Sequence, residues 1–212
     1  MIKKIPWLTL AMVAGVGLSA GIALSYLQNR PADPRSVDGL LWPDPPLLDP
    51  ITLIDQHGAP FTLEQLRGRW SMLFFGFTHC PDVCPLTLDI LSRAHAELAT
   101  HPAYNGRGQV IFVSVDPERD SPALLADYVG HFDPAFIGVT APLDSLQALT
   151  RKLGVFFQKT ALNGSDYSVD HTAAIFFIDP ALRFVSVMMP PLDVATVVKR
   201  FDAISTFIDT TL

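Results

Sequence analysis

The stretch WSMLFFGFTHCPDVCPLTLDILSRAHAELA, residues 70–99, places an apolar run, two cysteines and a helical pattern in direct succession. The run Trp70–Phe77 is almost wholly apolar, which is typical of a strand buried on both faces. Pro85 suits the first turn of a helix, and the pattern after it predicts a helix to the end of the stretch. Cys80 and Cys84, the only cysteines among 212 residues, are therefore expected on a loop between a buried strand and a helix start.

Strand and helix patterns alternate through the chain from residue 51 onward. A short hairpin signal and a short capped helix come first, and an amphipathic helix comes last. After the cysteine loop, strands are predicted at QVIFVSV (109–115), FIGVT (136–140), TAAIFFID (172–179) and LRFVSVM (182–188), and helices at 122–131, 142–153 and 192–209. The stretch VFFQKT (155–160) follows the second of these helices. This order predicts the α/β class and, within it, a thioredoxin-like sandwich, in which helices flank a mixed central sheet. Ligands of such sheets bind at the carboxyl ends of strands, which is where the cysteine loop falls.

The N-terminus carries the uncharged apolar segment IPWLTLAMVAGVGLSAGIALSYL (5–27) behind Lys3 and Lys4. As a helix it would span about 35 Å, enough for a hydrocarbon core of about 30 Å. A cleaved signal peptide is the alternative, but its apolar region is usually only about 7–15 residues long. We therefore expect residues 1–28 to be a transmembrane anchor. The lysine pair favours a cytoplasmic N-terminus, which would place the rest of the chain in the periplasm, at a bacterial inner membrane.

Residues 29–47 are interpreted as a proline-rich linker that leads to a globular domain at 48–212. Six prolines lie between Arg30 and Pro50, a composition that resists both helix and sheet. The alternative is that part of this segment packs as a strap on the domain, because Leu40–Trp42 is apolar. The net charge of −6 argues against a nucleic-acid-binding protein.

Two thiols four residues apart could exchange electrons, close a structural disulfide or bind a metal. Cys84 would lie at or beside the N-cap of the helix, where the helix dipole favours a thiolate. Thiolate pairs select soft ions such as Cu(I), zinc or the iron of Fe–S clusters. A structural zinc normally needs four protein ligands, and the spacing of the histidines shows no zinc pattern. Copper is less demanding, because two thiolates and one imidazole suit either of its oxidation states.

Six histidines are candidates for a third ligand. His79 neighbours Cys80, but adjacent residues of an extended segment point apart. His171 immediately precedes the predicted strand 172–179, and the loop before that strand packs against the dithiol loop in a thioredoxin-like topology. The competing interpretation of His171 is a turn residue capped by Asp170. The remaining histidines, which are His57, His95, His101 and His131, are expected on the surface.

Three stretches together resemble the signature motifs of the Sco/SenC family, namely GFTHCPDVCPLTL (76–88), VSVDPERDSP (113–122) and VDHTAAIFFIDP (169–180). The resemblance covers the chain from about residue 48 to its end. It implies a membrane-tethered, thioredoxin-like copper chaperone, rather than an enzyme, that helps to assemble cytochrome c oxidase. By this resemblance Cys80, Cys84 and His171 would bind one copper ion, Cu(I) or Cu(II).

The same resemblance implies partners. Subunit II of cytochrome c oxidase would receive the copper into its dinuclear centre. A periplasmic copper donor would supply it. A thiol reductant would also be needed, because an oxidising periplasm drives dithiols toward a disulfide, which cannot bind metal as two thiolates.

Three aspartates lie beside the expected ligands in the sequence, namely Asp82, Asp116 and Asp170. They could orient the imidazole, steer copper or dock a partner, although N-capping and turn formation also suit aspartate. Arg119 is expected to brace its loop. Packing is the favoured interpretation of Met188-Met189, at the end of a strand.

The alternative function is a thiol–disulfide oxidoreductase that reduces the cysteines of subunit II or acts in redox signalling. Such enzymes usually carry Cys-x-x-Cys and a proline opposite the dithiol, where this chain has Asp170-His171-Thr172. A peroxiredoxin is disfavoured, because that family needs a threonine three residues before its reactive cysteine. Phe77 and Pro81 occupy those positions here.

Overall fold

A computed structural model describes residues 17–22, 24–25, 37–41, 43–162 and 166–211 of the chain. The strands are β1 (Thr52–Asp55), β2 (Pro60–Thr62), β3 (Trp70–Gly76), β4 (Gly108–Ser114), β5 (Ile137–Thr140), β6 (Phe157–Ala161), β7 (Tyr167–His171), β8 (Ile175–Ile178) and β9 (Phe184–Met188). The helices are η2 (a 3-10 turn, Leu63–Gln65), α2 (Val83–Leu98), α3 (Pro122–Phe132), α4 (Leu143–Leu153) and α5 (Val194–Thr211).

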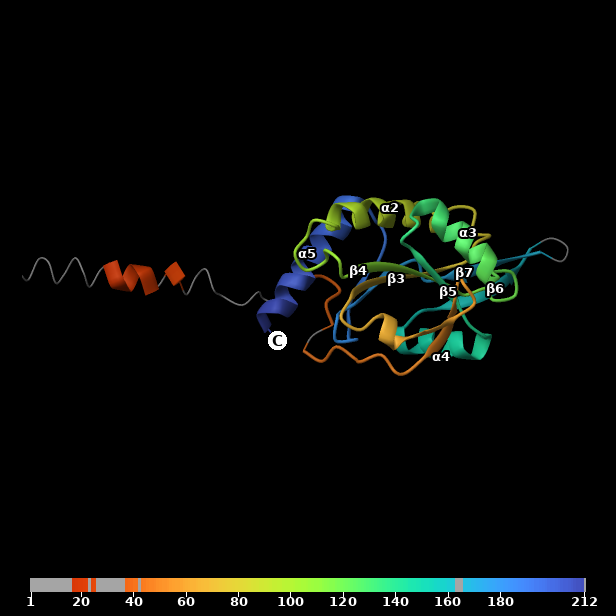
Figure 1. The fold of residues 1–212 in the computed structure, drawn as a ribbon, viewed down its shortest axis with the longest axis horizontal. Coiled ribbons are helices and arrows are strands. Elements are labelled where there is room, and N and C mark those ends of the chain that lie inside the picture. The colour runs from red at the N-terminus through yellow and green to blue at the C-terminus, as the bar shows by residue number, and fades with distance from the viewer. Residues whose placement is uncertain (1–16, 23, 26–36, 42, 163–165, 212) are drawn as a thin grey trace, which may run out of the picture.

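The strands form two sheets of unequal size. Seven strands make one mixed sheet in the order β2-β1-β5-β4-β3-β8-β9, and β6 pairs with β7 in a separate two-stranded sheet. Figure 1 shows α2, α3 and α5 over one face of the large sheet and α4 on the other face. This arrangement confirms the predicted thioredoxin-like sandwich of a mixed sheet between helices.

β3 is the central strand of the fold. It runs parallel to β4 and antiparallel to β8, and all seven of its residues are buried. Because side chains alternate between faces of a strand, both helical layers pack on β3, which explains why its sequence is apolar throughout. The carboxyl ends of β3 and β4 and the start of β8 share one end of the sheet.

The cysteine helix begins earlier than the sequence predicted. α2 starts at Val83 with Asp82 as its N-cap, so Cys84 lies inside the first turn. Pro85 occupies the third helical position rather than the first, which costs no hydrogen bond because the first turn has no partners for its N–H groups.

The segment before the last hairpin also differs from its prediction. Residues 167–171, expected as a loop, form strand β7, whose partner is β6. Alternation explains the strand, because Val169 is buried between two polar neighbours.

The described part of the proline-rich segment, residues 37–41 and 43–48, lies along β9. Leu41 N donates to Val185 O at 2.8 Å and Phe184 N donates to Pro46 O at 2.9 Å. Val37 and Leu48 are buried at either end of it. These residues therefore follow the strap alternative, and residues 29–36 and 42 lie outside the described part.

Within the described residues, no helix is both long and apolar enough to cross a membrane. Most of the predicted anchor, residues 1–16, 23 and 26–28, lies outside the described part. The anchor and the domain boundaries stay predictions.

Candidate metal centre

The structure brings Cys80, Cys84 and His171 together beside the carboxyl end of β3. Their two sulfurs and one ring nitrogen all lie within 4.8 Å of one another. Bonds of about 2.0–2.3 Å to a single ion hold such donors no farther apart than roughly 4.6 Å, so binding needs only a small movement. Among the described residues, this is the one group of three or more His, Cys, Asp or Glu donors at such spacing.

The two thiols occupy different environments. Cys84 is fully buried in the first turn of α2, whereas Cys80 is half-buried in the loop before the helix. The backbone N–H of Cys84 donates to Cys80 Sγ at 3.5 Å. Cys84 is therefore part of the core, and Cys80 lies nearer to the surface.

Gly76, the last residue of β3, makes room for the buried sulfur. A Cβ atom at this position would lie 2.8 Å from Cys84 Sγ and 2.8 Å from Phe112 Cε2. The sequence reasoning missed this role, and the available signal was a glycine that ends an otherwise bulky buried strand.

The pKa values of the two thiols diverge because they share a proton. A hydrogen bond from the Cys84 thiol, with others from His171 and from the Asp82 and Cys84 N–H groups, lowers the pKa of Cys80 to about 4 despite its burial. The pKa of Cys84 is raised, because its thiol donates to Cys80 and is itself buried. The expectation that the helix start makes the Cys84 thiolate easier to form than that of a free cysteine was wrong, since Cys84 lies in the core and donates its thiol proton to Cys80.

His171 ends β7, and its Nε2 lies 3.3 Å from Cys84 Sγ. The ring packs edge-on against Phe74 and Phe77, at centroid distances of 6.1 Å and 6.0 Å. Its other nitrogen, Nδ1, is buried and has no hydrogen-bond partner in the described part of the chain. Ligand histidines usually donate this second N–H to a carboxylate or carbonyl, so here strand position and aromatic packing must orient the ring.

Two of the three aspartates named from the sequence do not direct their carboxylates at the centre. Asp82 is exposed, and it is its backbone N–H that hydrogen-bonds Cys80. Asp170 accepts a hydrogen bond from Thr160 Oγ1 at 2.6 Å across the β6–β7 hairpin. Because neighbours on a strand point to opposite faces, Asp170 faces away from His171.

Asp116 is fully buried behind the centre. Its carboxylate accepts a hydrogen bond from Tyr167 Oη at 2.7 Å and another from Arg119 Nε at 2.5 Å. Asp116 therefore holds Tyr167 at the start of β7, the strand that ends at His171. Its ion pair with Arg119 agrees with the bracing role expected of Arg119.

Asp120 anchors the cysteine loop, and sequence reasoning did not single it out. Its buried carboxylate accepts hydrogen bonds from Thr78 N at 2.9 Å, Thr78 Oγ1 at 2.6 Å and Ser114 Oγ at 2.6 Å. Thr78 lies two residues before Cys80, so this carboxylate fixes the start of the loop. The signal that could have found it is the second aspartate of the DPERD stretch.

The other histidines lie away from the three donors. His79 is half-exposed, and its Nδ1 lies 3.0 Å from Thr78 Oγ1. His95, expected on the surface, is half-buried, with Nδ1 2.7 Å from Tyr104 Oη. That expectation was wrong because the His95 face of α2 packs against Phe136, and burial lowers the pKa of His95.

Fold and site together define a thioredoxin-like domain in which a dithiol loop and an opposing imidazole form a three-donor centre of metal-binding type. The chain belongs to the SCO1/SenC family, whose family model matches residues 44–205.

Two relatives show the extent of the similarity. Mitochondrial protein SCO2 of Saccharomyces cerevisiae is 39% identical over 141 residues, which cover 66% of this chain and 46% of that protein. A putative copper-binding protein of Stutzerimonas stutzeri is 37% identical over 158 residues, which cover 74% of this chain and 76% of that protein. The match spans about half the length of the yeast relative.

Solved structures agree with the fold. The crystal structure of Arabidopsis thaliana ScoI with copper bound superposes with a TM-score of 0.70 at 32% identity and covers 77% of this chain and 99% of that one. Apo Sco1 of Thermus thermophilus gives a TM-score of 0.67 at 38% identity, with 78% and 94% of the two chains covered.

Proposed function

We propose that this chain is a copper chaperone that binds one copper ion through Cys80 Sγ, Cys84 Sγ and His171 Nε2 and delivers it to subunit II of cytochrome c oxidase. The observation that carries the proposal is the convergence of these three donors within 4.8 Å, from segments 87 residues apart. Family membership and the copper-bound relative support the choice of metal.

The donor set fits copper better than a structural zinc. Two thiolates and one imidazole satisfy Cu(I) and Cu(II) alike, whereas a closed zinc site needs a fourth protein ligand. Three donors also leave one position open on the ion. An incoming ligand of a partner can then bind before any of the three leaves, which is what transfer of the ion requires.

The two thiols have different parts in loading. Cys80 is half-buried and already a thiolate near neutral pH, so it is the donor that can meet arriving copper. Cys84 is a buried thiol that must lose its proton as the ion binds, so loading releases a proton. His171 then completes the centre from the opposite side.

The cellular setting follows from the N-terminal sequence and from the thiol chemistry. Residues 1–28 would anchor the domain to a bacterial inner membrane, with the copper centre in the periplasm. A thiol reductant would keep Cys80 and Cys84 reduced there, and a periplasmic donor would supply copper.

Copper titration tests the proposal. The reduced full-length chain and its His171→Ala variant are titrated anaerobically with Cu(I) and with Cu(II). The loaded chain is then mixed with the domain of subunit II that carries the copper centre, prepared without copper. We expect one tight equivalent in the wild type, weaker binding in the variant and transfer to the subunit II domain. Absence of binding, or binding that His171→Ala leaves unchanged, would overturn the proposal.

A second candidate function, thiol–disulfide exchange, is favoured by one observation. The acidic, half-buried Cys80 beside the buried, high-pKa Cys84 resembles an attacking thiol with its resolving partner. The disulfide form of the subunit II domain separates the two functions. Rapid multiple-turnover reduction of this disulfide by the chain, with a thiol reductant supplied to regenerate Cys80 and Cys84 and with no detectable copper binding, would establish the reductase instead.

A further inference from the structure

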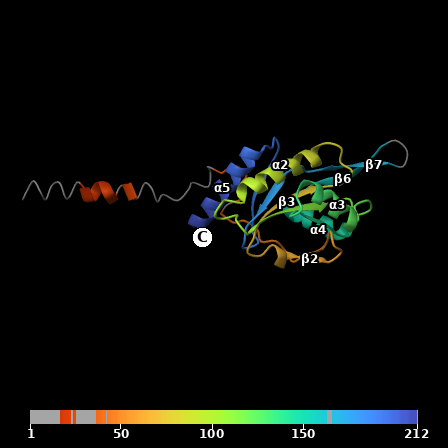
Figure 2. The same cartoon turned by 45° about the horizontal axis from the view of Figure 1, so that its top comes forward.

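The β6–β7 hairpin holds His171 outside the main sheet. The hairpin forms a sheet of its own, and in Figures 1 and 2 it projects from the end of the domain. The imidazole has no hydrogen bond through Nδ1 to fix it. The distance between His171 and the dithiol therefore depends on contacts between the hairpin and the body of the domain, as well as on the short link from His171 to β8, which begins at Ile175.

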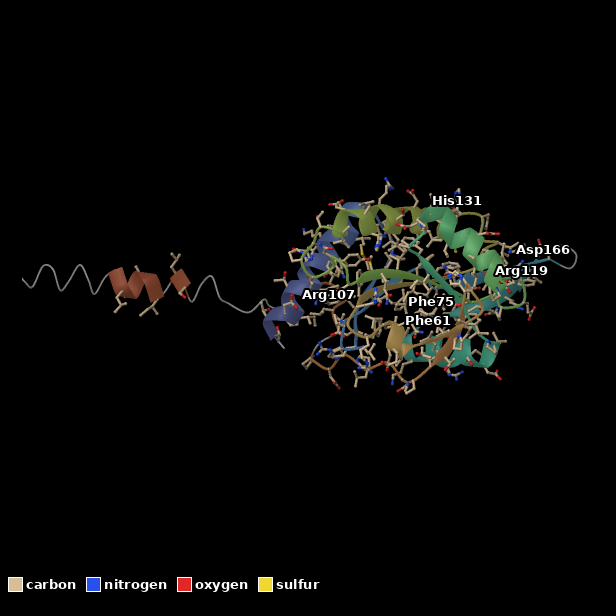
Figure 3. The ribbon with its side chains drawn as sticks, viewed as in Figure 1. Phe61, Phe75, Arg107, Arg119, His131 and Asp166 are labelled. Atoms are coloured by element: carbon tan, nitrogen blue, oxygen red, sulfur yellow. The ribbon has the colours of Figure 1, made fainter. Side chains whose placement is uncertain are left out.

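Besides Asp116 and Glu118, which contact Tyr167 and Lys159 of the hairpin, the side chain of Arg119 connects the body of the domain to this hairpin. Its Nη1 donates to Tyr167 O at 2.9 Å, and its guanidinium lies 3.7 Å from the centroid of the Tyr167 ring. Its Nε is bound to Asp116, which also accepts from Tyr167 Oη. Figure 3 shows Arg119 next to Asp166 at the turn end of the hairpin, where Nη1 and Oδ1 are 3.4 Å apart.

Two routes lead from Arg119 to the imidazole. Tyr167, Val169 and His171 are alternate residues of β7, so their side chains lie on the same face of the strand. The contacts that fix Tyr167 therefore also set the distance of His171 from the cysteine loop. The guanidinium also lies 5.7 Å from the ring centroid of Phe77, and Phe77 packs edge-on against the His171 ring. Tyr167 on the strand of His171 and Phe77 beside its ring thus both contact Arg119.

The loop that carries Arg119 also holds the dithiol. Asp120, the next residue, fixes the cysteine loop through Thr78. Residues 116–120 therefore connect both halves of the centre, with Asp120 on the dithiol side and Arg119 on the histidine side.

We infer that Arg119 is a positioning residue, which sets His171 opposite the two thiols without itself touching copper. This inference rests on the proposed copper-binding function. It makes the affinity for copper depend on a cationic side chain that contacts none of the three donors.

A second ion pair supplies a matched control. Arg183 binds the buried carboxylate of Asp179 through Nε at 2.6 Å, and its side chain is 20% exposed, against 19% for Arg119. This pair lies in the β8–β9 turn, at the other end of the sheet from the centre. Arg119→Gln and Arg183→Gln each remove a guanidinium that pairs with a buried aspartate, at opposite ends of the sheet.

The test compares these variants as full-length reduced chains loaded with Cu(I) or Cu(II) ions. Loss of an outer partner of a ligand histidine typically costs about 10–100-fold in metal affinity, so we expect a loss of about tenfold or more for Arg119→Gln. Arg183→Gln should remain within about twofold of the wild type. In the Cu(II) form, the electron paramagnetic resonance spectrum of Arg119→Gln should lose the nitrogen coupling of His171, which Arg183→Gln should keep.

A double variant shows whether Arg119 acts through the imidazole. In a His171→Ala background, Arg119→Gln should change copper affinity by less than about twofold, because the group it positions is gone. Tyr167→Phe is a milder variant, which keeps the ring but loses the hydroxyl to Asp116, and it should show the same loss of nitrogen coupling in part. Tyr167→Phe replaces Arg119→Gln in the test if Arg119→Gln does not fold.

Equal effects of Arg119→Gln and Arg183→Gln on affinity and on the spectrum would overturn the inference, as would a full additional loss in the His171→Ala background. Wild-type binding that does not depend on His171 is a different result, because it refutes the proposed centre itself.

Discussion

The two halves of the candidate metal centre are built in opposite ways. The dithiol half lies where β3, a strand buried along its whole length, meets α2, with Cys84 in the core and the loop tied to Asp120. The histidine half is one residue at the end of a two-stranded hairpin, held by aromatic packing and by Arg119. The contrast teaches that formation of the core places the two thiols. The imidazole is placed by contacts that can be removed without unfolding the core.

Cys84→Ser should have the largest effect, because it removes a donor that the core itself supplies. We expect copper affinity to fall by more than the roughly 100-fold that loss of an outer partner can cost. Competition with a Cu(I) chelator measures it. A loss larger than that of His171→Ala would support the distinction between the two halves of the centre, and a smaller loss would contradict it.

Gly76→Ala tests how closely the dithiol half is packed. The added methyl group would collide with Cys84 Sγ and Phe112, and such overpacking typically costs about 1–3 kcal/mol of unfolding free energy. Denaturant unfolding measures this loss. Gly130→Ala is the control, because that helical position has open space around it and alanine there should stabilise by about 0.5–1 kcal/mol. Equal shifts in the two variants would contradict the close packing.

The pH dependence of binding tests the division between the thiols. Above about pH 5, Cys80 is already a thiolate, because its pKa is about 4, while Cys84 keeps its proton because its pKa is raised. Binding must then release one thiol proton, so copper affinity should rise by about tenfold per pH unit as the pH increases. At pH 6, iodoacetamide should alkylate Cys80 before Cys84, and the reverse order would refute the assignment.

Asp170→Ala should have the smallest effect on copper. Asp170 adjoins His171 in sequence, but its carboxylate bonds Thr160 on the opposite face of the hairpin. We expect copper affinity to stay within about twofold of the wild type, and unfolding free energy to fall by no more than about 1 kcal/mol. A large loss of affinity in chelator competition would show that this carboxylate orients the imidazole after all.

Local sequence patterns were sufficient to predict the strand and the helix that flank the dithiol loop. An apolar run followed by a proline-marked helix predicts β3 and α2 from neighbouring residues, and both are present. The position of Cys84 was harder, because a helix start that moves by two residues turns a helix-capping thiol into a buried one. The relative acidity of the two thiols then follows first from the hydrogen bond between them and then from burial, neither of which the spacing reveals.

The histidine half depended on information that local patterns lack. His171 was placed opposite the thiols by topology and by family motifs, yet strand β7 was not predicted because five residues of weak alternation need a partner strand to become visible. Thr78 and Asp120 are 42 residues apart, and Arg119 and Tyr167 are 48 apart. Contacts at such separations follow from the fold rather than from propensity.

The strap along β9 has a consequence for self-association. An outermost strand with free N–H and C=O groups is a template on which a second chain can add a strand. Residues 39–41 and 46–48 occupy such groups by bonding to the backbone from Leu182, just before β9, to Val187 within it. Pro60 begins β2, the strand at the opposite edge of the sheet. The segment that leads into the domain therefore also protects it from aggregation.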